Sequence, residues 1–174
     1  MRPFHAAFAA VLSAVPALSF ACWTEAASRY GVSADLLYAV AQVESNLNPN
    51  AVNRTHFKRT GQYDIGLMQI NSSHLHQLAR YGITEHDLYN ACTNIHVGAW
   101  LLAESFHRHG VSWNAVGAYN AACVKLRGTA CNEARSTYAW RVYRKLSRSA
   151  GLFQPSFRQQ QAGIQVTHSQ GGQP

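Results

Sequence analysis

The chain has 174 residues, of which 47% are hydrophobic and 13% are charged. A domain averages about 150 residues, so length and composition indicate one globular domain and exclude a disordered, collagen-like or multidomain protein. Lysine and arginine outnumber aspartate and glutamate by 15 to 8, which gives a formal net charge of +7.

Residues 1–21 have the pattern of a secretory signal peptide. Arg2 precedes an apolar run that ends in the small-x-small sequence Ser19-Phe20-Ala21, which predicts export and cleavage after Ala21. The run is too short and too rich in alanine to span a bilayer, which takes about 20 strongly apolar residues. The alternative is a buried first helix, which the basic start disfavours. We therefore expect the folded domain over residues 22–151.

All four cysteines, Cys22, Cys92, Cys123 and Cys131, lie in the exported part of the chain. An even number in an oxidising compartment predicts two disulfides, for which three pairings exist. We favour Cys22 with Cys92, which ties the N-terminus to the middle of the chain, and Cys123 with Cys131, which closes a short loop. Cleavage would leave Cys22 as the first residue, but the preceding residues lack the pattern of a lipid-transfer site, so a lipoprotein is not expected.

Helix signals recur along the chain and strand signals are scarce, which predicts a mostly α domain. N-cap residues, glycines and a proline delimit the expected helices, which cover about 22–30, 33–48, 71–82, a start at 84, 92–110, 112–121 and 132–150. Residues 50–63 are polar and predict a long loop or a small hairpin. Residues 152–174 are rich in glutamine, glycine and serine and predict a flexible tail.

The positive charge is concentrated at the C-terminal end. Residues 22–134 contain eight basic and eight acidic residues, whereas six basic and no acidic residues follow from Arg135 onward. The last helix carries Arg141, Arg144, Lys145 and Arg148 along one side, where they form a solvated face or attract an anionic wall polymer, a membrane surface or an acidic secretion component. A nucleic-acid partner is not expected, because the domain is neutral over most of its length.

Glu44 continues the apolar stripe of its helix, since it lies four residues after Val40 and seven after Leu37. Burial among apolar side chains raises the pKa of a carboxyl group, and a protonated glutamic acid can donate a proton to a leaving oxygen. The alternative is a structural glutamate paired with an arginine.

Four motifs in order resemble the lytic transglycosylases with a lysozyme-like fold. They are Gln42-Val43-Glu44-Ser45-Asn46-Leu47-Asn48-Pro49, Asp64-Ile65-Gly66-Leu67-Met68-Gln69-Ile70-Asn71, Asn94-Ile95 with Gly98, and Ala118-Tyr119-Asn120-Ala121. The resemblance covers about residues 22–146. Within the family, the chain most resembles the small exported members associated with type III and type IV secretion systems and pili. Several of these share the Cys-Trp start that stands here at Cys22-Trp23.

The resemblance implies a mostly α, lysozyme-like domain with a glycan-binding cleft and a short loop or hairpin region. It implies that the enzyme acts in the periplasm on the glycan strands of peptidoglycan. Glu44 would protonate the glycosidic oxygen between N-acetylmuramic acid and N-acetylglucosamine. It would then take the proton of the muramoyl 6-hydroxyl, which closes on the anomeric carbon and leaves a 1,6-anhydro end without consuming water.

The resemblance also implies a set of substrate-binding positions, which are Ser45, Met68, Gln69, Asn71, Tyr119 and Asn120. Gln69 would hydrogen-bond a sugar, and the hydroxyl of Tyr119 would lie near Glu44 and orient it. For Met68 a place in the core is the favoured interpretation. Local capping of the backbone is an equal alternative for Asn120.

Two positions depart from the family pattern. Ala122 stands where family members usually have glycine after the Tyr-Asn-Ala sequence, so the turn there is expected to differ, with the loop from Cys123 to Cys131 as a compensating feature. Asp64 is found in secretion-associated members and animal-type lysozymes rather than in most transglycosylases. A second carboxylate facing Glu44 would stabilise a cationic transition state, or permit hydrolysis as in a retaining glycosidase. The alternative is an aspartate that caps the turn before Gly66.

Other polar and aromatic clusters carry less weight. His74 with His76 and His107 with His109 point to different helix faces, so we expect no metal site and no cofactor. Trp100, Trp113 and Trp140 are expected in the core rather than as sugar platforms. The competing functions are a hydrolytic muramidase and a non-catalytic, glycan-binding assembly adaptor, and a monomer is expected in each case.

Overall fold

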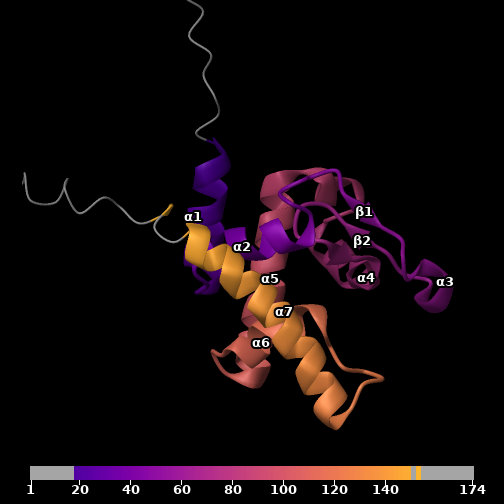
Figure 1. Ribbon diagram of the computed structural model, residues 1–174. Helices are drawn as coiled ribbons and strands as arrows, with labels where there is room; N and C mark the ends of the chain where they lie inside the picture. The colour runs from indigo at the N-terminus through magenta and orange to yellow at the C-terminus, as the bar shows by residue number, and fades with distance from the viewer. Residues whose placement is uncertain (1–17, 150–151, 154–174) are drawn as a thin grey trace, which may run out of the picture.

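The computed structural model describes residues 18–149 and 152–153 (Figure 1). Most of the expected signal peptide and most of the expected tail at 152–174 lie outside these residues. The described part of the chain is predominantly helical with three very short strands, which confirms the mostly α class. It contains no helix that is both long enough and apolar enough to cross a membrane.

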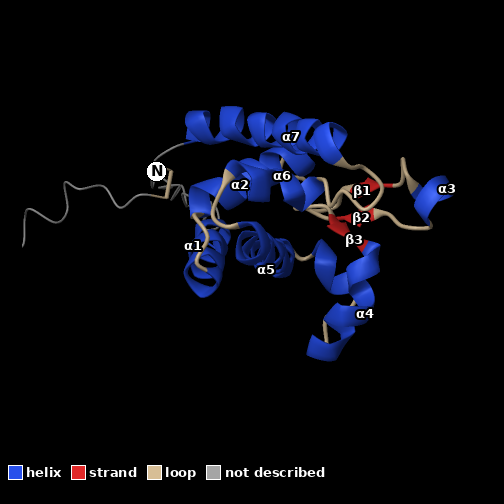
Figure 2. Cartoon of the chain, turned by 90° about the horizontal axis from the view of Figure 1, so that it is seen from below, coloured by secondary structure: helices blue, strands red, loops and turns tan. Residues whose placement is uncertain are grey.

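The helices and strands divide into a helical part and a smaller part built around a sheet (Figures 1 and 2). In chain order the elements are α1 (Leu18–Tyr30), α2 (Ala34–Glu44), β1 (Val52–Asn53), α3 (Phe57–Thr60), β2 (Asp64–Ile65), β3 (Ile70–Asn71), η1 (Ser72–His74), α4 (Leu75–Leu78), η2 (Ala79–Tyr81), η3 (His86–Tyr89), α5 (Ala91–His109), α6 (Trp113–Asn120) and α7 (Gly128–Ser149). Figure 2 shows α7 lying across α2 and α6, with both of which it packs.

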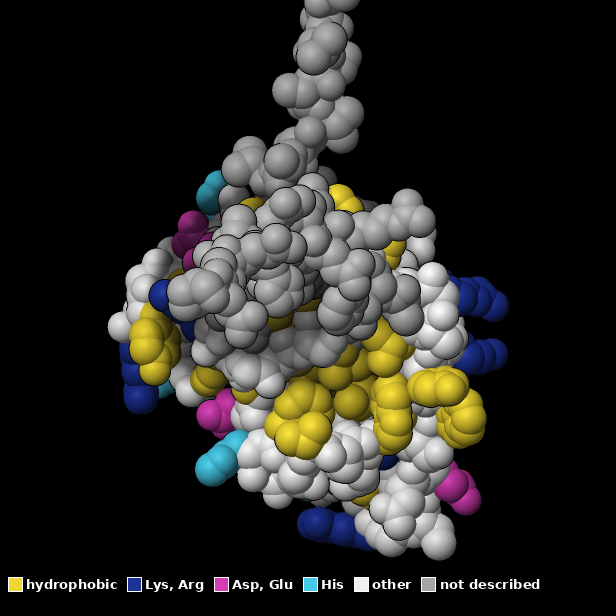
Figure 3. All heavy atoms as spheres, turned by 90° about the vertical axis from the view of Figure 1, so that its left-hand side faces the viewer, with side chains coloured by type: hydrophobic (Ala, Val, Ile, Leu, Met, Phe, Trp, Pro, Cys, Tyr) yellow, Lys and Arg dark blue, Asp and Glu magenta, His cyan; other side chains and the backbone are white. Residues whose placement is uncertain are grey.

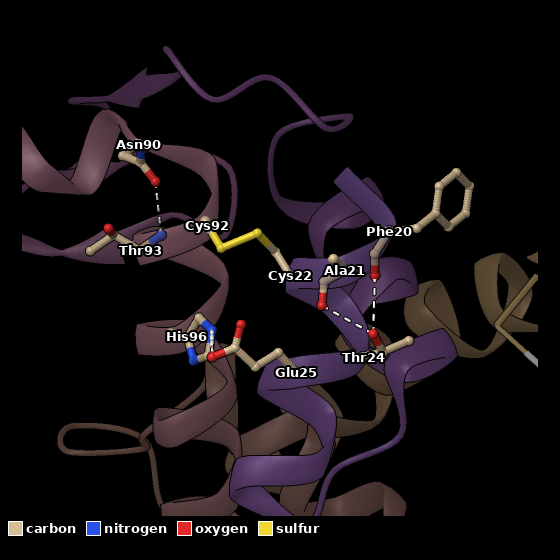
Figure 4. The surroundings of a disulfide bond; sticks show 9 residues. All are labelled: Phe20, Ala21, Cys22, Thr24, Glu25, Asn90, Cys92, Thr93 and His96. Atoms are coloured by element: carbon tan, nitrogen blue, oxygen red, sulfur yellow. Dashed lines mark hydrogen bonds and ion pairs between the residues drawn. A yellow bond between two sulfur atoms is a disulfide. The ribbon is translucent and has the colours of Figure 1, made fainter. Parts of the chain in front are cut away.

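Helix α1 is joined covalently to α5. The disulfide Cys22–Cys92 links them, and on the same side Glu25 Oε1 lies 3.8 Å from His96 Nε2 (Figure 4). The second disulfide joins Cys123 to Cys131, so both expected pairings are confirmed. Helix α1 begins at Leu18 and continues past the cleavage point expected after Ala21.

Helix α2 begins as expected and ends earlier than expected. The Ser33 hydroxyl accepts a hydrogen bond from the Leu36 amide, which caps the first turn. The helix was expected to continue to Asn48-Pro49 but ends at Glu44, because Asn46 and Leu47 take left-handed backbone conformations with φ of 54° and 65°. Glu44 therefore occupies the last helical position, beside an irregular turn.

The polar segment after α2 folds back as a small antiparallel sheet with the order β1-β2-β3. The expected loop or hairpin at residues 50–63 includes β1, but the pairing of β2 with β3 was not expected. Strands of two residues are too short to show an alternating pattern, so the sequence carries little signal for them. The sheet brings Asp64 opposite Asn53 on one side and Asn71 on the other.

Helix α5 runs through the middle of the core. Ile95, Ala99 and Leu102 lie at helical spacing and are buried along one face, and Gly110 follows the last turn at His109. A Cβ atom added to Gly98 would lie 2.4 Å from Met68 Sδ, so this glycine allows the sheet region to pack closely on the helix.

Two of the three tryptophans expected in the core are exposed. Trp113 is 44% exposed and Trp140 is 62% exposed, and Tyr143 lies between them in edge-to-face contact with each. Together with Asn114 and Ser136 they line a pocket of about 330 Å³ between α6 and α7. Figure 3 views the molecule from the left-hand side of Figure 1 and shows hydrophobic side chains gathered on that face. Helical periodicity explains the exposure of Trp140. Helix α7 buries Tyr138 and Val142, which are four residues apart, and Trp140 falls between them on the other side of the helix.

Candidate active site

Glu44 is half-buried at the C-terminal end of α2. The residues before it on the same stripe, Leu37, Val40 and Ala41, are fully buried, so the helix places a carboxyl group at the edge of the hydrophobic core. The expected alternative, a structural pairing with an arginine, is not observed, because within the described residues neither salt bridge involves Glu44.

The hydroxyl of Tyr138 donates a hydrogen bond of 2.5 Å to Glu44 Oε1. Tyr138 comes from α7 and is almost completely buried. Burial raises the pKa of Glu44 from 4.5 to about 7, although the hydrogen bond from Tyr138 opposes the increase. The carboxyl group can therefore hold a proton near neutral pH and still form a carboxylate that is hydrogen-bonded, as a group that alternates between acid and base requires.

Asp64 is the second carboxylate near Glu44, and its negative charge contributes to the raised pKa of Glu44. Its two carboxylate oxygens accept hydrogen bonds from residues on the two neighbouring strands, β1 and β3. Asn71 Nδ2 donates to Oδ1 at 2.8 Å and Asn53 Nδ2 donates to Oδ2 at 3.3 Å, while His56 Nδ1 lies 3.7 Å from Oδ2. Asp64 accepts no hydrogen bond from the turn at Gly66 within the described residues, which disfavours the alternative of a capping aspartate.

The segment between β2 and β3 is fixed to α5 by Asn94, which is fully buried. Its Oδ1 accepts from the amide of Met68 at 2.7 Å, and its Nδ2 donates to the carbonyls of Ile65 and Leu88. Gly66 has a φ of +76°, and an added Cβ would lie 2.2 Å from Asn94 Nδ2. A glycine is therefore required for both the backbone conformation and the close approach.

Met68 is not a substrate-binding side chain. It is fully buried and packs against Gly98, which confirms the favoured interpretation of Met68 as a core residue and leaves its side chain no exposed surface for a sugar. Its apolar, flexible side chain fills the space between the sheet region and α5, and only its backbone reaches the polar network.

Three of the other expected substrate contacts have structural partners. The Ser45 hydroxyl donates to the Leu67 carbonyl at 2.6 Å, and Asn71 caps η1 while it holds Asp64. Gln69 has a φ of +51°, and its Nε2 donates to the carbonyls of Gly66 and Ala51. These side chains hold the turn in place.

Tyr119 does not hydrogen-bond Glu44. Its hydroxyl donates to the Met68 carbonyl at 3.0 Å, and the hydroxyl that hydrogen-bonds Glu44 belongs to Tyr138 on α7. Glu44 is still close enough for its charge to raise the pKa of Tyr119, after the larger effect of burial. Asn120 is exposed at the last position of α6.

The turn after α6 contains the position at which this chain departs from the family's residue pattern. Ala122 stands at the usual glycine position, and the left-handed residue is the next one, Cys123, with a φ of 58°. Cys123 also forms the disulfide to Cys131, so the left-handed residue is covalently tied to the first turns of α7.

Sequence reasoning missed Tyr138 and Asn94 as site residues. Helical spacing places Tyr138 on the same face of the last helix as Val142 and Leu146. A tyrosine on a buried stripe needs a hydrogen-bond partner, and this requirement was the available signal. Asn94 belonged to a recognised motif without an assigned role. Among the described residues, no group of three or more histidine, cysteine, aspartate or glutamate side chains is arranged to hold a metal ion.

Comparison with known proteins supports the motif resemblance. A family model described as the transglycosylase SLT domain matches residues 21–139. The chain is 41% identical over 129 residues to the invasion protein IagB of Salmonella typhimurium, a match that covers 72% of this chain and 76% of that protein. It is 43% identical over 124 residues to the X polypeptide of Escherichia coli (71% and 70% covered) and 38% identical over 130 residues to the protein IpgF of Shigella flexneri (74% and 81% covered).

The family model spans well over half of the chain, and it includes Glu44, Asp64, the turn at Gly66 and Tyr119. Both the sequence match and the mostly α fold agree with the resemblance that the four motifs indicate. The chain therefore belongs to the transglycosylase SLT domain family, the family of the lytic transglycosylases.

Proposed function

We propose that this protein is a periplasmic lytic transglycosylase that cleaves the β-1,4 bond between N-acetylmuramic acid and N-acetylglucosamine in peptidoglycan and leaves 1,6-anhydro ends. The observation that carries the proposal is the environment of Glu44. Its pKa of about 7 and its hydrogen bond from Tyr138 suit a single carboxyl group that first donates and then accepts a proton.

In the proposed reaction, protonated Glu44 transfers its proton to the glycosidic oxygen as the bond from that oxygen to the muramoyl anomeric carbon breaks. The muramoyl 6-hydroxyl oxygen then bonds to the anomeric carbon, and its proton returns to Glu44. No water is consumed and the enzyme regains its starting protonation state. The Tyr138 hydroxyl stabilises the intermediate carboxylate, and the negative charge of Asp64 stabilises the oxocarbenium-like transition state.

The proposed cellular role is to open the wall locally for a type III or type IV secretion or pilus apparatus. Two observations support it. The N-terminal pattern predicts export to the compartment that contains peptidoglycan. One of the relatives is named an invasion protein, and the similarity covers most of both chains. The substrate partner is the glycan strand, and a component of the apparatus is a further partner.

The experiment is product analysis by mass spectrometry after incubation of purified sacculi with the native protein, with Glu44→Gln, and with the control Glu133→Gln. Glu133 is exposed on α7, so its substitution removes an equal charge away from the site. We expect anhydro-muropeptides from the native protein and the control, and none from Glu44→Gln with an unchanged circular dichroism spectrum. Sacculi left intact by the native protein would instead favour the non-catalytic adaptor.

A second candidate function is a hydrolytic muramidase, favoured specifically by the position of Asp64 close enough to Glu44 to affect its pKa. In a retaining glycosidase a second carboxylate forms a glycosyl-enzyme intermediate that water hydrolyses. The same mass spectra separate the two functions, because hydrolysis leaves reducing muramic acid ends in place of anhydro ends.

A further inference from the structure

A basic pocket lies in the groove between α2 and α7. It has a volume of about 220 Å³ and is lined by Gln42, Val43, Arg141, Arg144, Lys145 and Arg148. Four of its six lining residues are cationic and none is acidic. We call this set of six residues the basic pocket.

The four cations share one side of α7. Their positions follow the i, i+3, i+4, i+7 spacing that places side chains along one helix face, over a length of about 10 Å. Within the described residues none of them forms a salt bridge, and the sequence contains no aspartate or glutamate after Glu133. Like charges this close repel one another, so a bound anion would relieve a repulsion that no salt bridge among the described residues offsets.

The basic pocket begins beside the candidate active site. Arg141 Nη2 donates to the carbonyl of Val43 at 3.4 Å, and Val43 is the residue before Glu44. The positive charge of Arg141 also lowers the pKa of Glu44, against the larger effect of burial. A ligand that reaches Glu44 therefore has the first cation of the basic pocket next to it, and the remaining three further along α7.

We propose that the basic pocket binds the carboxylates of the peptide stem of peptidoglycan. The identity of this ligand rests on the proposed function, because the stem is attached to the muramic acid whose bond Glu44 would cleave. A stem of three residues extends about 10 Å, which matches the length of the cationic row. Arginine binds carboxylates in a bidentate geometry, and three of the four cations are arginines.

An anionic bilayer is the competing ligand for a basic helix face. A bilayer presents a broad flat surface, whereas these cations line a recess that Gln42 and Val43 close on the side of α2. The recess favours a narrow ligand that enters it. Arg141 lines the recess and also contacts Val43, the residue before Glu44, which favours a part of the glycan substrate.

The test is a calorimetric titration with the synthetic stem L-Ala-γ-D-Glu-meso-diaminopimelate and with its carboxamide derivative. All titrations use the Glu44→Gln background, so that binding is measured without cleavage. We expect the carboxylate peptide to bind, and the double variant Arg144→Gln/Arg148→Gln to weaken binding about tenfold or more. The variant Arg144→Lys/Arg148→Lys should regain part of the affinity, because it restores charge without the bidentate geometry.

A matched control is Arg80→Gln/Arg108→Gln, which removes the same charge from exposed positions on η2 and α5. It should bind the peptide as the parent does, and melting curves establish that each variant is folded. The proposal is overturned if the carboxamide binds as well as the acid, if the control weakens binding equally, or if phosphatidylglycerol vesicles bind while the peptide does not. Failure to cut sacculi by the native protein would overturn the proposed function, whereas this titration reports on the pocket alone.

Discussion

The Tyr138 hydroxyl reaches Glu44 across 94 positions of the chain, and the hydrogen bond joins the buried faces of α7 and α2. The same packing that removes Glu44 from water supplies the donor that holds its carboxylate. Burial raises the pKa of Glu44 to about 7 and the hydrogen bond limits the increase. The balance between these two effects leads to predictions on stability and on rate.

The Glu44→Gln variant should gain stability relative to the native protein as the pH rises. The pKa of Glu44 is about 7 in the folded chain and 4.5 ordinarily. Between pH 4.5 and about 7 the folded state therefore binds more protons than the unfolded state, and the free energy of unfolding of the native protein falls as the pH rises. Glutamine does not titrate. The free energy difference should shift by about 3 kcal/mol in favour of the variant between about pH 4 and about pH 8.

Denaturant unfolding of both proteins at the two pH values measures this shift, and the titrations of all other groups cancel in the difference. A difference that stays constant with pH would show that Glu44 titrates at its ordinary pKa. A shift of opposite sign would show that the hydrogen bond from Tyr138 outweighs burial.

Tyr138→Phe should slow the reaction and raise the pKa of Glu44. The hydrogen bond favours the carboxylate, so its removal moves the loss of activity on the alkaline side to higher pH. Loss of a hydrogen bond to a charged group should lower kcat about 10- to 100-fold. The measurement is the pH profile of anhydro-muropeptide release. Tyr143→Phe, on the same helix but exposed, is the control, and an equal effect there would contradict a specific role for Tyr138.

Asp64→Asn should move the loss of activity on the alkaline side, here called the alkaline limit, to lower pH. The charge of Asp64 raises the pKa of Glu44, so the neutral amide allows Glu44 to lose its proton at lower pH. The rate should also fall about 10- to 100-fold because a negative charge near the oxocarbenium-like transition state is removed. The pH profile of product release measures both effects. Asp87→Asn, at a half-buried position where the carboxylate accepts hydrogen bonds from Thr84 rather than lying near Glu44, serves as the control. A limit that moves upward in Asp64→Asn would exclude the proposed electrostatic role.

Asn94→Ala should destabilise the fold by about 3 kcal/mol or more. The buried side chain hydrogen-bonds the backbone of Met68, Ile65 and Leu88, and each buried partner left unsatisfied costs about 1 to 3 kcal/mol. Urea unfolding gives the value. Asn114→Ala, at an exposed position, should change stability by less than about 1 kcal/mol, and similar losses in the two variants would show that the network around Asn94 is not the cause.

The two disulfides should contribute unequally to stability. Cys22–Cys92 spans 70 positions and Cys123–Cys131 spans 8, and the loop-entropy relation gives about 4 kcal/mol for the longer loop and about 2 kcal/mol for the shorter. Thermal unfolding of the paired serine variants, one disulfide at a time, tests the order. The reverse order would mean that the left-handed conformation at Cys123 depends strongly on its disulfide.

Local patterns in the sequence were sufficient to predict many of the helix ends and the position of Glu44. Capping by Ser33 and Ser112, and the stops at Gly31 and Gly110, depend on contacts within a few residues, so they are readable without a fold. The position of Glu44 on a buried stripe follows from helical periodicity for the same reason. The four motifs indicated the family because their order and spacing carry information that composition lacks.

Tertiary structure decided which groups surround Glu44. Tyr138 and Asp64 approach it from α7 and β2 through packing of distant segments, and no local pattern specifies which of several tyrosines or aspartates makes that approach. The exposure of Trp113 and Trp140 was likewise decided by which face of α7 packs on α2 and α6. Hydrogen bonds and burial between remote segments depend on the whole fold, so the sequence alone identified the acid and only the tertiary structure identified the groups that control its proton.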